Sequence, residues 1–192
     1  MSITHFLTAL TAAAALLLPL TPVQATTLNC TGGVVNCGYA LDGHVPAEFG
    51  GWTDQTAYWS GMSDSVTVDF GAATFVSGLT ISLDNNDSYL VEASLDGSHW
   101  STMLTVHDYQ GTVWYGMDTF STVVGHAQYD AGLDFHAGSA RYLRVSAFGG
   151  DTWNSVGEIG VGVTAVPEPS SGALMLGGLA LLAGAARRRC AA

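Results

Sequence analysis

Residues 79–100 have the sequence LTISLDNNDSYLVEASLDGSHW, and this stretch decides the fold class. Apolar and polar residues alternate over 79–83 and again over 89–95. A period of two residues puts one face of each segment in a core, which is typical of half-buried β-strands. Asp96-Gly97 then predicts a tight turn. The stretch therefore predicts antiparallel strands joined by short connections.

The same alternation occurs before and after this stretch, over 66–70, 143–147 and 159–163. Glycine, aspartate and asparagine interrupt the chain between these segments, and no segment between residues 26 and 165 has convincing helical periodicity. The fold class that this pattern predicts is all-β, an antiparallel β-sandwich.

The charge of the chain is strongly acidic, at −11, and the sequence contains no lysine. Three of its five basic residues form the run 187–189, so only Arg141 and Arg144 remain for the rest of the chain. The absence of lysine excludes Schiff-base chemistry and a P-loop. An acidic chain also lacks the basic surface that nucleic-acid binding requires, so we expect no nucleic-acid partner.

Residues 1–25 have the features of a secretory signal peptide. An apolar run over 7–20 is followed by Pro22 and then by Val23-Gln24-Ala25, which offers small residues for cleavage. The alternative is a membrane anchor, although the run is short for one and contains Pro19.

The carboxyl end has three parts in a fixed order. The first is Val166, Pro167, Glu168, Pro169 and Ser170; the second is the uncharged stretch 172–186; the third is Arg187, Arg188 and Arg189. As a helix the uncharged stretch would be about 22 Å long, a marginal transmembrane span for a hydrocarbon core of about 30 Å. The arginines would stay on the cytoplasmic side, which leaves the rest of the chain outside.

This tail resembles the PEP-CTERM sorting signal of Gram-negative bacteria over residues 166–189. The resemblance implies recognition by exosortase, a transient stay of the hydrophobic helix in the inner membrane, and export through that membrane. The product would belong to the cell envelope, the outer surface or the extracellular matrix, as in exopolysaccharide- and biofilm-producing bacteria. The alternative is a plain tail anchor.

Residues 26–165 remain as one β domain, which we call the body. It is long enough to enclose a core. Cys30 and Cys37 lie close together in an exported segment, where a small disulfide loop is the expected arrangement. A metal site would need more ligands nearby, and no histidine accompanies the two cysteines.

Several segments of the body resemble, in order, the discoidin-type, galactose-binding-like jelly roll. They are Ala40-Leu41-Asp42-Gly43, Trp59-Ser60, residues 65–71 (SVTVDFG), residues 89–100, residues 140–145 (ARYLRV) and Glu158-Ile159. Members of this family are mostly non-catalytic modules that bind carbohydrate, lipid headgroups or other proteins. Trp59 and Trp100 match tryptophans of the family's core.

The resemblance also implies a structural calcium ion as the one cofactor to consider, held by Asp42, Thr56 and Glu158. Calcium takes six to eight oxygen ligands. His44 stands where the family usually has an oxygen-bearing side chain, which removes one ligand. The alternative is that Asp42 caps a turn and Glu158 is solvated.

Exposed aromatic residues on loops are the candidate polysaccharide contacts, because a flat ring stacks on the apolar face of a sugar. The long segment 107–136 carries Trp114 and Tyr115, and the loop before the last strand carries Trp153 and Asn154. The alternative is that these tryptophans close the ends of the sandwich.

No catalytic residue is assigned, because the sequence contains neither an H-E-x-x-H nor a G-x-S-x-G motif. We therefore expect an exported, non-catalytic envelope or matrix protein that is sorted by exosortase and binds polysaccharide through its β-sandwich. The alternatives are a self-associating structural matrix protein and a secreted glycan hydrolase.

Overall fold

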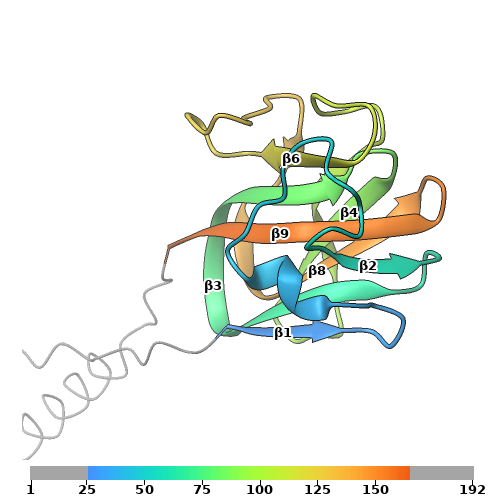
Figure 1. The fold of residues 1–192 in the computed structure, drawn as a ribbon. Coiled ribbons are helices and arrows are strands. Elements are labelled where there is room, and N and C mark those ends of the chain that lie inside the picture. Colours follow the sequence, from blue (N-terminus) through green and yellow to red (C-terminus); the bar gives the residue numbers. More distant parts are fainter. Residues whose placement is uncertain (1–25, 165–192) are drawn as a thin grey trace, which may run out of the picture.

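The structure is a computed structural model that describes residues 26–164 (Figure 1). The expected signal peptide, residues 1–25, and the expected sorting tail, residues 166–189, lie outside the described residues. Within 26–164, no helix has the length and apolar character needed to cross a membrane.

The described chain is all-β and antiparallel, as the alternation predicted. Its elements are β1 (Thr27–Cys30), the 3-10 helix η1 (Cys37–Leu41), β2 (Ala57–Ser60), β3 (Ser65–Asp84), β4 (Ser88–Ser94), β5 (Ser101–Val106), β6 (Met117–Ser121), β7 (Asp134–Phe135), β8 (Gly138–Gly149) and β9 (Trp153–Thr164).

The long strand β3 organises the fold. The strands pair in the order β2-β9-β3-β8-β4-β5-β7, and β1 and β6 also pair with β3. The first part of β3 pairs with β1 and β8, and its last part pairs with β9 and β6. Between the two parts the register with β8 shifts between Asp69 and Thr74, and Figure 1 shows β3 bending there. One strand thus serves both layers of the sandwich.

The core contains most of the apolar positions that alternation identified, together with others such as Val76, Leu104 and Phe120. The residues of the alternating segments that are fully buried or nearly so are Val66, Val68, Leu79, Ile81, Leu83, Tyr89, Val91, Leu143, Val145 and Ile159. Trp59 joins them, as predicted, with 1% of its surface exposed. Trp100 is half-buried, and the guanidinium carbon of Arg144 lies 4.1 Å from its ring centroid.

The predicted disulfide between Cys30 and Cys37 is present, with the two Cα atoms 6.1 Å apart. It joins the end of β1 to the start of η1. The opening segment is therefore fixed covalently to the first strand of the body.

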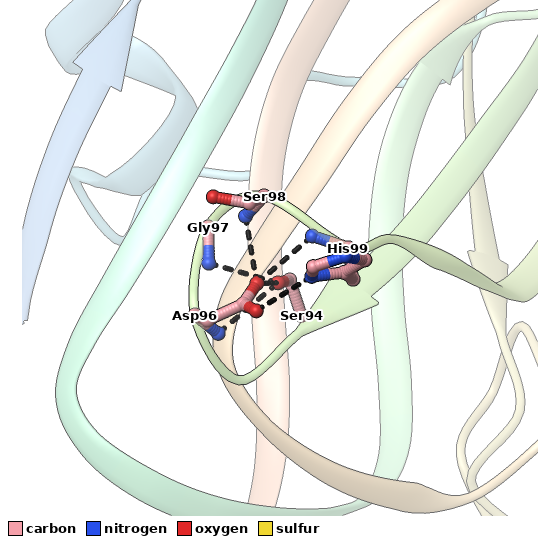
Figure 2. Close-up of polar contacts among 5 residues, drawn as sticks. All are labelled: Ser94, Asp96, Gly97, Ser98 and His99. Carbon is pink, nitrogen blue, oxygen red and sulfur yellow. Dashed lines mark hydrogen bonds and ion pairs between the residues drawn. The ribbon is translucent and has the colours of Figure 1, made fainter.

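The predicted turn at Asp96-Gly97 connects β4 to β5 (Figure 2). Gly97 has a φ of 75°, in the left-handed region that favours glycine. Asp96 Oδ1 accepts the backbone N–H groups of Ser98 and His99, both at 2.8 Å, and Asp96 Oδ2 lies 2.7 Å from His99 Nδ1. These bonds to His99 and Ser98 hold the pKa of Asp96 well below its usual range.

The segment 107–136, which is long for a single connection, contains β6 and β7. All five residues of β6 are buried, including Asp118 and Thr119. The Asp118 carboxylate accepts the backbone N–H groups of Thr112 (2.7 Å) and Val113 (3.2 Å). A strand buried on both faces shows no alternation, which explains why the pattern did not predict it.

Candidate functional site

A cleft of about 550 Å³ opens where four connections of the sandwich meet. They are the loop between η1 and β2, the β3–β4 turn, the loop before β6, and the β8–β9 turn with the first residue of β9. The residues that line it are Phe49, Gly50, Gly51, Trp52, Asp84, Asn86, Tyr115, Gly116, Asp151 and Trp153. Segments far apart in the sequence thus build one concave surface.

The loop between η1 and β2 is fixed against β6. Phe49 N donates to the Met117 carbonyl at 2.9 Å, and Met117 N donates to the Gly50 carbonyl at 3.1 Å. In Figure 1 this loop runs from η1 across β9 to β6 and returns to β2. Gly116 has a φ of 72°, and a Cβ atom there would lie 2.7 Å from the Gly50 oxygen. The close approach of the two loops therefore requires glycine at this position.

Aromatic rings form the walls of the cleft in two pairs. The ring centroids of Trp52 and Trp153 are 5.5 Å apart, and those of Phe49 and Tyr115 are also 5.5 Å apart. Tyr115 and Trp153 each expose about half of their surface, 49% and 51%. Rings that pack on one another and still face solvent offer rigid apolar surfaces for a sugar ring.

A buried carboxyl group, that of Asp84, also lines the cleft. Asp84 exposes 3% of its surface, and its Oδ1 atom has no hydrogen-bond partner among the described residues. Burial, with a smaller contribution from the negative charge of Asp151, raises the pKa of Asp84 to about 7. The group therefore changes charge near neutral pH.

Two further aspartates, Asp87 and Asp151, hold the β8–β9 turn in place through hydrogen bonds. Asp87 Oδ1 accepts the backbone N–H of Asp151 at 2.9 Å. Asp151 in turn accepts the backbone N–H of Trp153 at 2.9 Å and the side-chain amide of Asn86 at 3.0 Å. Burial raises the pKa of Asp87 to about 7, even though the bond from Asp151 opposes the shift. These bonds fix the position of Trp153 at the edge of the cleft.

Two of the four residues predicted to contact polysaccharide, Tyr115 and Trp153, line the cleft. Trp114 is 81% exposed and packs on Tyr115, with the ring centroids 4.7 Å apart, but it does not line the cleft. Asn154 is fully buried, and its amide donates to the Gly61 carbonyl at 2.8 Å. Asn154 therefore holds a turn and is not accessible to a ligand, contrary to its predicted role.

Sequence reasoning did not predict Phe49, Trp52, Asn86 or Asp84 as site residues. The available signal was the pattern Phe49-Gly50-Gly51-Trp52, two aromatic residues around a flexible pair in a connection. Asp84 had no signal of its own, because carboxylates are common throughout this acidic chain.

The residues predicted to bind calcium lie partly together. Gly43 N donates to Glu158 Oε2 at 3.0 Å, so the opening loop meets β9 at the predicted position. Asp42 Oδ1 accepts the backbone N–H of His44 at 2.8 Å, which is the turn-capping alternative. Thr56 is fully buried, and its hydroxyl donates to the Trp52 carbonyl.

The carboxylates at this position already have hydrogen-bond partners. Carboxylate oxygens of Glu158 and Asp42 face backbone N–H groups of the loop, and residues 26–164 contain no group of three His, Cys, Asp or Glu side chains suited to a metal ion. Glu158 is half-buried, and burial raises its pKa. The calcium ion stays a prediction.

The comparison with protein families identifies the tail. The model of the PEP-CTERM protein-sorting motif matches residues 165–189. The chain therefore carries this motif, as the three-part tail predicted, and the motif indicates export and sorting to the cell envelope. No curated protein matches the chain.

Solved structures similar to the chain include carbohydrate-binding modules. The CBM32 of AlyQ, in complex with 4,5-unsaturated mannuronic acid, has a TM-score of 0.51 and 18% identity, and the match covers 71% of this chain and 93% of that one. Truncated AlyQ, with CBM32 and alginate lyase domains, has a TM-score of 0.50 and 19% identity; the match covers 74% of this chain and 32% of that one. CpGH89CBM32-6 from Clostridium perfringens has a TM-score of 0.47 and 16% identity, and the match covers 76% of this chain and 97% of that one.

At these identities the similarity establishes the fold, a discoidin-like β-sandwich of the CBM32 type, as the sequence predicted.

Proposed function

We propose that this protein is a non-catalytic component of the cell envelope or extracellular matrix that is sorted by exosortase and binds polysaccharide through the cleft. The observation that carries the proposal is the cleft itself, where two aromatic pairs enclose Asp84, Asn86 and Asp151. Apolar walls with a few polar groups are what carbohydrate recognition requires. The binding of a mannuronic acid derivative by the AlyQ module supports the class of ligand.

Trp153 is the residue on which the proposal is best tested. Its side chain is half exposed, so truncation removes ligand-binding surface with little loss of core. A glycan array with the full-length protein, held in a detergent without a sugar headgroup, should identify bound polysaccharides. Trp153→Ala should reduce that binding by about tenfold or more, equal to about 1.4 kcal/mol.

Tyr109→Ala provides the matched control, because Tyr109 is also an exposed aromatic residue and does not line the cleft. Binding lost equally in both variants would contradict the role of the cleft. Concentration-dependent association in ultracentrifugation without any glycan signal would favour a self-associating structural protein. Turnover of a polysaccharide would favour a hydrolase.

A further inference from the structure

The negative charge of the cleft restricts which sugars can bind there. Asp84 and Asp151 are both acidic, and among the residues described as lining the cleft none is lysine, arginine or histidine. The only two arginines in the body are already paired: Arg141 with Asp69 at 3.1 Å and Arg144 with Glu92 at 2.7 Å. No basic side chain of the cleft is therefore available for the carboxylate of an acidic sugar.

Asp84 differs from the two neighbouring aspartates, Asp87 and Asp151, in holding a buried carboxylate oxygen without a hydrogen-bond partner. Asp87 and Asp151 each use both carboxylate oxygens in hydrogen bonds to described residues. Asp84 Oδ1 is the exception, since it is buried and unpartnered in a residue that lines the cleft. A buried acceptor without a donor costs about 1–3 kcal/mol, and more when it is charged. A ligand that donates a hydrogen bond to the carboxyl group of Asp84 offsets part of this cost.

Three kinds of ligand group differ in how well they match the Asp84 carboxyl group. A sugar hydroxyl supplies the hydrogen bond but leaves the negative charge of the cleft uncompensated. A divalent cation supplies charge but needs several free oxygens, and residues 26–164 have no suitable group of ligands. An ammonium group supplies both the hydrogen bond and the opposite charge.

We propose that the cleft binds a polysaccharide with free amino groups, whose sugar ammonium group donates to Asp84 while its ring packs against Trp153 and Tyr115. The inference rests on the function proposed above and specifies its ligand. It also separates this protein from the AlyQ module, because the carboxylate of a mannuronic acid would meet Asp84 and Asp151 in this cleft.

Three trisaccharides test the inference by isothermal titration calorimetry with the full-length protein, in a detergent without a sugar headgroup. They are the trisaccharides of glucosamine, N-acetylglucosamine and mannuronate, which carry positive, no and negative charge. Glucosamine trisaccharide should bind at least about tenfold more tightly than the acetylated one, and mannuronate trisaccharide should bind most weakly.

Substitutions assign the difference to Asp84. Asp84→Asn should abolish the preference for glucosamine over N-acetylglucosamine, with the fold checked by circular dichroism. Asp134→Asn removes the same charge from an 82% exposed side chain outside the cleft and should preserve the preference. Trp153→Ala should weaken the binding of both sugars.

The outcomes separate the two proposals. Equal affinity for the two glucosamine forms, tighter binding of mannuronate, or a preference that survives Asp84→Asn would overturn the amino-sugar inference alone. Binding of none of the three sugars, together with a glycan array that shows no binding sensitive to Trp153→Ala, would overturn both.

Discussion

At the scale of single residues, the burial of Asp84 affects the stability of the protein. Its pKa in the folded protein is about 7, above its ordinary value of 3.8. The folded state therefore keeps a proton that the unfolded state releases between these two values. The free energy of unfolding must fall as pH rises through this window, since the folded state then binds more protons.

Asp84→Asn should accordingly stabilise the protein at alkaline pH. An amide does not ionise, so the variant avoids a buried negative charge next to Asp151. We expect a gain on the order of 2 kcal/mol in the free energy of unfolding at pH 8, shrinking toward pH 4. Chemical denaturation at the two pH values measures it. A gain of the same size at both would show that the charge of Asp84 is not the cause.

The same scale shows where sequence reasoning succeeds and where it does not. Tyr115 and Trp153 were predicted because a flat ring on a loop can stack on the apolar face of a sugar, and both line the cleft. Asp84 follows an alternating strand and looks like an ordinary turn residue. Its burial depends on the loops before β6 and after β8, which no local pattern places beside it.

At the scale of elements, Glu158 joins two parts of the chain. Its carboxylate accepts the backbone N–H of Gly43 at 3.0 Å, so β9 contacts the opening loop directly. If calcium also binds here, it should raise the melting temperature more than equal magnesium does, because magnesium demands tighter octahedral geometry. Glu158→Gln should remove that difference.

Differential scanning calorimetry with each ion distinguishes a bound calcium ion from the hydrogen bond between Glu158 and Gly43 alone. The hydrogen bond alone predicts equal, small shifts with calcium and magnesium in the wild type and in Glu158→Gln alike, because the side-chain oxygen of glutamine can still accept the Gly43 N–H. A calcium-specific shift that persists in Glu158→Gln would place the ion elsewhere in the protein.

The strands also show which features the local sequence pattern predicts and which depend on contacts between distant segments. All five alternating segments lie in strands, apart from Leu95, which lies in the turn after β4. Two of the segments, 66–70 and 79–83, belong to one strand, because β3 continues through its bend. Alternation identifies a strand with one buried face, but it cannot identify a bend or a fully buried strand such as β6.

At the scale of the whole molecule, the sorting motif at 165–189 predicts a processed product. We expect exosortase to remove the hydrophobic stretch and the arginines of the tail after export. Intact-mass measurement of the protein from the envelope fraction should show a product that lacks residues 187–189. The same protein from cells without exosortase should retain them, and retention in exosortase-positive cells would contradict the prediction.

The length of β9 sets the distance between the cleft and the sorting motif. Trp153 at one end of β9 lines the cleft, and Thr164 at the other end directly precedes the sorting motif. Eleven steps of about 3.3 Å separate the two ends by about 36 Å. The strand therefore works as a spacer. A molecule tethered by its carboxyl end would hold the cleft away from the tether, where the polysaccharide that we propose as its ligand can reach it without crowding against the anchoring surface.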